Sequence, residues 1–188
     1  MSNQGWAETV ASAQLSGTGL VSFTTAASIL PAQALYTIPT DNWYIGKQFK
    51  ILAAGQVSNV VTAQPTFTFN VLFGATTVFT TGAILTSTTA HTTVPFWLEV
   101  MLTCRAVGAT ANLMGQGWTM SRAWIDAGAT ADATTVGHAS LMVPETTPAV
   151  GSNYNSNASQ QVDLQAACSV SNAANAIQLH QYQLMEMN

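Results

Sequence analysis

Three histidines, His91, His138 and His180, are the side chains of this 188-residue sequence that most often serve as metal ligands or general bases. They lie far apart in the chain, and none stands at a metal-ligand spacing with Cys, Asp or Glu. A cupin-type metal site needs two histidines one residue apart, and His-x-His does not occur. We therefore expect no metal site and no cofactor.

Hydrolytic chemistry has equally little support in the sequence. Glycoside hydrolysis uses two carboxylates that face each other across a groove, and the candidates are few: Glu99, Asp126, Asp132 and Asp163. The Gly-x-Ser-x-Gly turn of a serine nucleophile is absent from the sequence. Gly115-Gln-Gly117 is followed by no helical pattern, so it is not a dinucleotide loop. We expect no catalytic residues and a protein that is not an enzyme.

Tryptophans are better suited to binding than to catalysis. Trp97, Trp118 and Trp124 could form an aromatic platform for a sugar or a partner, although aromatic residues that face a second sheet or a neighbouring subunit are the favoured interpretation. Trp6 lies in a polar N-terminal stretch, where it either anchors a partner or packs on its own domain. The candidate partner-binding residues are Trp6, Trp97, Trp118 and Trp124.

The composition excludes several classes of function. Only 6% of the residues are charged, against roughly 25% in typical domains. The four basic residues are too few to neutralise a run of phosphates, so we expect no direct nucleic-acid binding. No apolar run reaches the length of about eighteen residues that a membrane span needs, and no signal peptide is recognisable. A surface with so little charge favours association, and we expect a homo-oligomer.

The segment 94–107 is the strand around which the rest of the chain is organised. Its apolar side chains alternate with polar ones, and they predict one face in a core: Val94, Phe96, Leu98, Val100, Leu102, Cys104 and Ala106. Gly108 breaks this pattern and 111–122 resumes it, which predicts a long hairpin whose second arm is bulged or closely approached. We expect Glu99 on the outer face to pair with Lys50 or Arg122 across strands.

Similar patterns predict further strands and a single β domain. Alternation marks strands at 47–61, 66–73, 76–82, 138–143, 160–170 and 176–187, with loops at 84–93, 127–135 and 144–158. A bulge near His180 would repair the imperfect alternation of the last strand. Cys104 and Cys168 fall at inward positions and are expected to be free thiols. Residues 1–14 have no strand pattern, so we expect an N-terminal arm followed by one domain at 15–188. The fold class is all-β, an antiparallel two-sheet β-sandwich of jelly-roll type.

The order of four motifs resembles the small β-sandwich virion proteins of tailed bacteriophages. These motifs are Gly46–Gly55, Thr68–Gly74, Val94–Arg105 and Leu113–Gly117, and the resemblance extends over roughly Leu35 to Met187. It implies a structural virion protein made in the host cytoplasm and located on the capsid surface. The implied role is a capsid decoration (cement) protein that stabilises the head, with the major capsid protein as partner and a homotrimer as the expected oligomer. The alternative is a head-fibre or tail-associated receptor- or carbohydrate-binding module.

Overall fold

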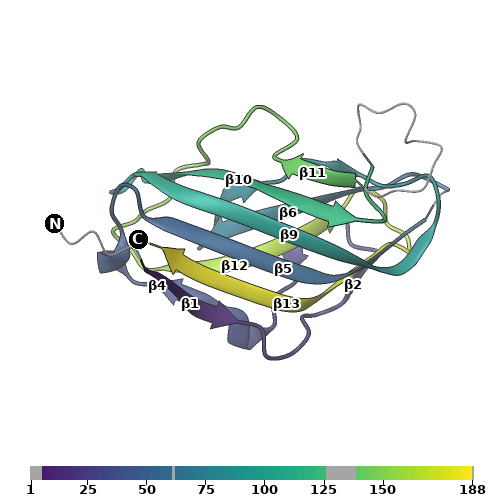
Figure 1. Cartoon of the computed structure of the whole chain (residues 1–188), viewed down its shortest axis with the longest axis horizontal. Helices are drawn as coiled ribbons and strands as arrows, with labels where there is room; N and C mark the ends of the chain where they lie inside the picture. The colour runs from purple at the N-terminus through teal and green to yellow at the C-terminus, as the bar shows by residue number, and fades with distance from the viewer. Residues whose placement is uncertain (1–5, 61, 126–138, 188) are drawn as a thin grey trace.

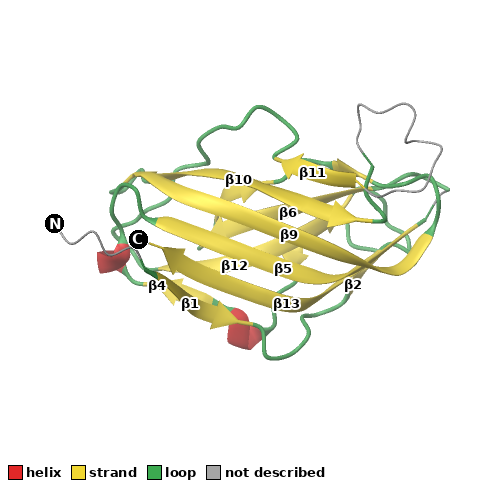
Figure 2. Ribbon diagram, viewed as in Figure 1, coloured by secondary structure: helices red, strands yellow, loops and turns green. Residues whose placement is uncertain are grey.

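Two antiparallel β-sheets pack face to face in the computed structural model of this protein, which describes residues 6–60, 62–125 and 139–187. Figure 1 looks onto the larger sheet, with strands β6 and β12 of the smaller sheet behind it. The two short 3₁₀ turns, η1 (Ala32–Ala34) and η2 (Thr40–Asn42), are the helical segments visible in Figure 2. The predicted all-β sandwich is confirmed.

The larger sheet has seven strands among the described residues. Its path runs β1 (Ala7–Ser12), β13 (Ala176–Met187), β5 (Gln48–Asn59), β9 (His91–Ala106), β10 (Asn112–Ser121) and β11 (Ala139–Val143), and β2 (Leu20–Val21) also pairs with β13. The smaller sheet follows the order β3 (Ala27–Ser28), β12 (Gln160–Cys168), β6 (Thr66–Phe73) and β7 (Thr76–Thr80), with β4 (Tyr36–Ile38) paired to β12 and β8 (Ile84–Leu85) paired to β6.

The order of the strands is that of a jelly roll. β13 lies between β1 and β5 in one sheet, while β12 lies between β3 and β6 in the other, so the last two long strands of the chain are each inserted between earlier ones. In a jelly roll, antiparallel strands joined in Greek-key order are divided between two sheets, and this places late strands next to early ones. β10 and β11 extend the larger sheet beyond β9.

Strand β9 supplies the centre of the core, as its alternation predicted. Phe96, Leu98, Val100, Leu102 and Cys104 are buried, and the residues between them lie on the outer face. β9 pairs with β5 on one side and with β10 on the other, and the predicted hairpin between β9 and β10 is confirmed. The second arm is closely approached rather than bulged, because a Cβ atom at Gly117 would overlap the carbonyl oxygen of Glu99. The register shift between Asn112 and Leu113 passes over Arg105, so the additional residue lies in the first arm, β9.

Two predictions about irregular segments are wrong. The expected loop 84–93 contains strand β8, and strand β9 already begins at His91, whose side chain is buried. Within the expected arm, Ala7–Ser12 forms strand β1, which pairs with the outer edge of β13. An edge strand with most side chains exposed needs no alternation of apolar and polar residues, so this strand has no sequence signature.

Strand β13 contains the bulge that its sequence predicted. Its register with β5 shifts between Leu179 and Gln181, so that His180 is the additional residue. Beyond the bulge, Tyr182 and Leu184 are buried, whereas their glutamine neighbours point away from the core. The bulge therefore keeps the apolar side chains of both halves of the strand in the core.

Candidate functional site

The four tryptophans predicted to bind a partner lie in different environments. Trp124 is fully buried, its ring centroid lies 5.4 Å from that of Phe67, and its Nε1 donates a hydrogen bond to Thr119 Oγ1 at 3.2 Å. The assignment of Trp124 as a partner-binding residue is wrong, because its buried ring packs against Phe67 of the smaller sheet, in agreement with the favoured interpretation of an aromatic residue that faces the second sheet. Trp6 is 43% exposed, and the centroid of its ring lies 5.1 Å from the Nζ atom of Lys47.

Trp97 and Trp118 both lie on the outer face of the larger sheet. Trp97 of β9 stands opposite Met120 of β10, and Trp118 of β10 stands between Glu99 of β9 and Met142 of β11. Both indoles are half-buried, while Met120 is 47% exposed and Met142 is 69% exposed. The outer face of β9, β10 and β11 thus exposes large, uncharged side chains.

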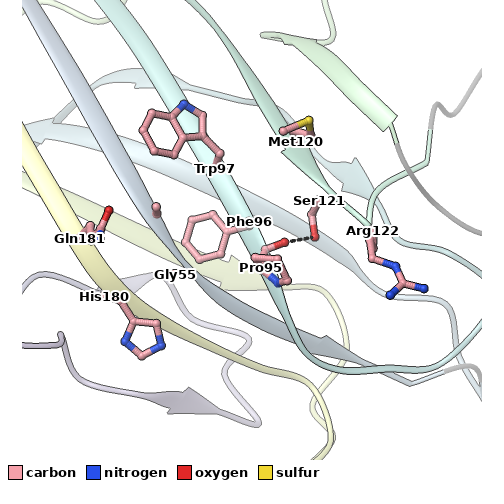
Figure 3. A pocket seen from close by; sticks show the side chains of 10 residues that line it. Gly55, Pro95, Phe96, Trp97, Met120, Ser121, Arg122, His180 and Gln181 are labelled. Atoms are coloured by element: carbon pink, nitrogen blue, oxygen red, sulfur yellow. Dashed lines mark hydrogen bonds between the residues drawn. The ribbon is translucent and has the colours of Figure 1, made fainter.

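A cleft of about 530 Å³ opens beside Trp97 on this face. Four strands contribute to it: β5, β9, β10 and β13, which are remote from one another in the sequence. Figure 3 shows the ring of Phe96 next to Gly55, with His180 and Gln181 on the β13 side and Met120, Ser121 and Arg122 on the β10 side. The lining is completed by Ala54, Pro95 and Trp97.

Two local irregularities of the backbone shape this cleft. At Gly55, a Cβ atom would overlap the carbonyl oxygen of Gln178 and lie 2.9 Å from Cε1 of Phe96, so glycine permits β5 and β13 to approach here. The bulge in β13 presents two consecutive side chains, His180 and Gln181, to solvent. The sequence predicted the bulge, but not that it would border a cleft.

Hydrogen bonds hold the walls of the cleft in place. Ser121 Oγ donates to the carbonyl oxygen of Pro95 at 2.8 Å, which ties the end of β10 to β9 (Figure 3). Thr119 Oγ1 donates to the carbonyl oxygen of Trp97, also at 2.8 Å. Ser16 Oγ and His180 Nδ1 lie 2.9 Å apart. The walls are thus preorganised, which lowers the entropic cost of binding a ligand.

The Nε1 atom of Trp97 is a donor that the protein does not use within the described residues. This atom is buried and makes no hydrogen bond to any of them. A buried N–H without a partner lowers the stability of the fold. Because no hydrogen bond from the described residues holds this indole, its position depends on the packing of its ring. The aromatic ring, rather than its N–H group, is therefore the part of Trp97 that can serve a ligand in the cleft.

Charged groups next to the cleft are largely neutralised. Lys50 Nζ lies 2.7 Å from Glu99 Oε1, which confirms one of the predicted cross-strand pairings. Among the ten lining residues, Arg122 carries a full charge and none is a carboxylate. The cleft therefore offers an apolar surface with a few polar groups and one guanidinium, a composition typical of ligand pockets.

The histidines and cysteines do not assemble a reactive centre in the described part of the chain. His91 is buried at the start of β9, His180 is exposed in the cleft, and His138 lies outside the described residues. In the same ranges, no group of three His, Cys, Asp or Glu side chains could hold a metal ion. Cys104 and Cys168 are free and buried, and burial raises the pKa of both thiols.

The loop 144–158, which the alternative function would use, is attached to the sandwich. The backbone N–H of Gly151 donates to Leu113 and that of Tyr154 donates to Ala111, each at 2.8 Å. The phenol ring of Tyr154 is buried against Trp43 and Phe73. This loop therefore lies along the first residues of β10 and is bonded to their backbone. The other loop, 127–135, lies outside the described residues.

No family model and no curated protein matches this sequence. One solved structure, described as "Structure of the CBM2 module of Lactobacillus casei BL23 phage J-1 evolved Dit", is similar to it with a TM-score of 0.32 and 9% identity. The similarity covers 82% of this chain and 68% of that chain. Within residues 6–60, 62–125 and 139–187, no helix is long and apolar enough to span a bilayer. The chain is thus an all-β sandwich of two antiparallel sheets with a cleft on the outer face of the larger one.

Proposed function

We propose that this protein is a structural component of a phage particle that binds a saccharide in the cleft beside Trp97. The observation that supports this function is the combination, in one cleft of about 530 Å³, of a half-buried indole with polar side chains from two opposite walls. This size falls in the range of roughly 300–1,000 Å³ that is usual for small-molecule sites. A cleft that could hold a ligand, with no carboxylate among its ten lining residues, suits a module that binds a sugar without the carboxylate pair of a glycosidase.

The chemistry of the lining favours a sugar over an apolar ligand. A pyranose has apolar C–H faces and a rim of hydroxyl groups, so it needs an aromatic or aliphatic surface together with hydrogen-bonding groups. Trp97, Pro95 and Met120 supply the first, and Gln181 and His180 supply the second. A purely apolar ligand would leave these polar groups unpaired on binding, which costs free energy.

Membership of a phage particle is supported by the sequence resemblance and by the surface. The virion proteins that the motifs resemble are small β-sandwiches, and the present chain has their jelly-roll order. Only 6% of its residues are charged. A surface with so few charges is suited to packing against like subunits in an assembly.

Glycan-array binding tests the saccharide function. The purified protein, Trp97→Ala and the control Trp118→Ala would be compared on an array of bacterial surface saccharides. Trp118 lies on the same outer face but does not line the cleft. We expect binding by the wild-type protein and by Trp118→Ala, and loss of binding by Trp97→Ala. Absence of binding by the wild-type protein, or equal losses in both variants, would overturn the proposal.

Capsid decoration is the second candidate function, and exposed methionines favour it. Met101, Met120 and Met142 are 44–69% exposed on the outer face of β9, β10 and β11, where a neighbouring subunit could cover them. In this role the protein, as a trimer, would bind the major capsid protein, and Trp6 would contribute at the β1 edge.

A head-binding assay separates the two candidates. Met142→Gln and Trp6→Ala would be tested for attachment to heads that lack the protein, with sedimentation to measure the oligomeric state. Decoration predicts weakened attachment for at least one variant and unchanged saccharide binding for Met142→Gln. If neither variant nor the wild-type protein attaches to heads, decoration is excluded.

A further inference from the structure

The charge of the cleft differs from that of the chain. The whole sequence has eight acidic and four basic residues, yet the lining of the cleft contains Arg122 and His180 and no acidic residue. The carboxylate of Glu99, on the same outer face, is neutralised by Lys50. A guanidinium in a cleft without carboxylates favours a ligand with a negative charge.

We infer that the cleft takes an anionic saccharide, whose carboxylate or phosphate group is bound by Arg122. This inference rests on the proposed saccharide function and adds the chemical class of the sugar. An uncharged sugar would leave the guanidinium of Arg122 without a counter-charge, whereas the anionic group of an acidic sugar would form an ion pair with it.

Arg122 is available for such a contact. Its side chain is exposed directly after the end of β10, next to Ser121, whose hydroxyl is fixed on Pro95. Two ion pairs form among the described residues, Lys47–Glu186 and Lys50–Glu99, and neither involves Arg122. The planar guanidinium can donate two parallel hydrogen bonds to a carboxylate or phosphate, which a lysine cannot do.

The opposite wall can recognise the hydroxyl groups of the same sugar. Ser16 Oγ engages His180 Nδ1 at 2.9 Å, which orients the imidazole and leaves its other ring nitrogen for a ligand. Gln181, the next residue of the bulge, is exposed and has both a donor and an acceptor in its amide. One wall thus supplies the guanidinium of Arg122, and the other supplies the hydrogen-bonding side chains of His180 and Gln181 (Figure 3).

A polyanion with closely spaced phosphates fits this cleft less well. Four basic residues in the whole chain cannot neutralise a nucleic-acid backbone. Lys47 is buried in its pair with Glu186, and Lys50 is engaged with Glu99. A single guanidinium in the cleft suits one anionic group per bound sugar unit.

Matched pairs of acidic and neutral saccharides test the inference. The panel consists of glucuronate and glucose oligomers, galacturonate and galactose oligomers, and the 6-phosphates of glucose and galactose. Binding would be measured by titration calorimetry for the wild-type protein, Arg122→Gln and the control Arg105→Gln. Arg105 is also exposed and lies on β9, but it does not line the cleft, so both variants change the net charge equally.

We expect the acidic member of at least one pair to bind more tightly than the neutral one. Arg122→Gln should weaken that binding by roughly tenfold or more, since a hydrogen bond to a charged group is lost, and Arg105→Gln should change it less than twofold. Uronates and sugar phosphates in the panel distinguish a carboxylate from a phosphate ligand. Equal affinity for acidic and neutral partners, or equal effects of the two arginine variants, would overturn the anionic class while leaving saccharide binding intact. No binding across the panel and the array would overturn both.

Discussion

The Nζ atom of Lys47 lies 3.0 Å from Oε2 of Glu186, and the two side chains are 1% and 5% exposed. Asn42 Nδ2 donates to the other carboxylate oxygen at 2.7 Å. The pair joins the start of β5 to the end of β13, two strands that also border the cleft further along. Desolvation of the two charges offsets much of the free energy that a buried ion pair contributes. Removal of one partner is strongly destabilising, because the other charge then stays buried without compensation.

Lys47→Met should therefore lower the free energy of unfolding by about 3–5 kcal/mol, because the Glu186 carboxylate is left buried and uncompensated. The matched control is Lys50→Met, which breaks the ion pair with Glu99. The side chains of Lys50 and Glu99 are 28% and 24% exposed. That variant should change the free energy of unfolding by less than about 1 kcal/mol. Urea denaturation measures both, and equal losses would contradict the assignment of Lys47 as the essential buried charge.

Leu98→Ala should lower the free energy of unfolding by about 2–5 kcal/mol, because it leaves a cavity between the two sheets. Leu98 is fully buried on the inner face of β9. Its neighbour Trp97, half-buried on the outer face, should cost less when replaced by alanine. Chemical denaturation that ranked the two variants in the opposite order would contradict the assignment of the faces.

Gly117→Ala should destabilise the protein by roughly 1–3 kcal/mol through overpacking. A Cβ atom at this position would overlap the carbonyl oxygen of Glu99 and lie 2.9 Å from the Cα atom of Val100, so β9 and β10 would have to separate. Gly19→Ala is the control, because its Cβ would meet only the side chain of Gln178 at 3.8 Å. The control should stay within about 0.5 kcal/mol of the wild type. A thermal melt of both variants checks this, and similar shifts in the two would refute it.

The protein should lose stability as the pH rises above about 8.5, the usual pKa of a cysteine in an unfolded chain. Burial raises the pKa of Cys104 and Cys168 in the folded state, so above this pH the unfolded chain releases protons that the folded protein retains. The stabilisation is complete below pH 8.5 and decreases as the pH rises toward the folded pKa values. Burial acts in the same direction on the phenol of Tyr182 at higher pH.

Urea midpoints between pH 7 and pH 10 measure this effect. The double variant Cys104→Ala, Cys168→Ala should have a smaller decrease between pH 8 and pH 9.5, where the tyrosines of the unfolded chain are still largely protonated. A midpoint that stays constant over this range in the wild-type protein would be evidence against the effect of the buried thiols.

The sequence alone determined the long strands and the composition of the core. Phe96, Leu98 and Val100 alternate with outer-face residues because one face of β9 is buried, and burial of one face imposes a period of two. The same logic predicted the bulge at His180, since without an additional residue the apolar side chains of β13 would turn to the outside. Both features are properties of a single strand and of which of its two faces is buried, so they can be predicted from a local stretch of sequence.

Only the tertiary structure decided the position of Trp124, the strand β1 and the cleft. Trp124 follows the end of β10, where no period continues, and its burial results from a turn that folds it over Phe67. β1 is held by backbone hydrogen bonds to an edge, which any sequence without proline can form. The cleft joins Gly55, Trp97, Arg122 and His180, whose proximity depends on the register between strands far apart in the chain. Register is set by the pairing of whole strands, and no single segment encodes it.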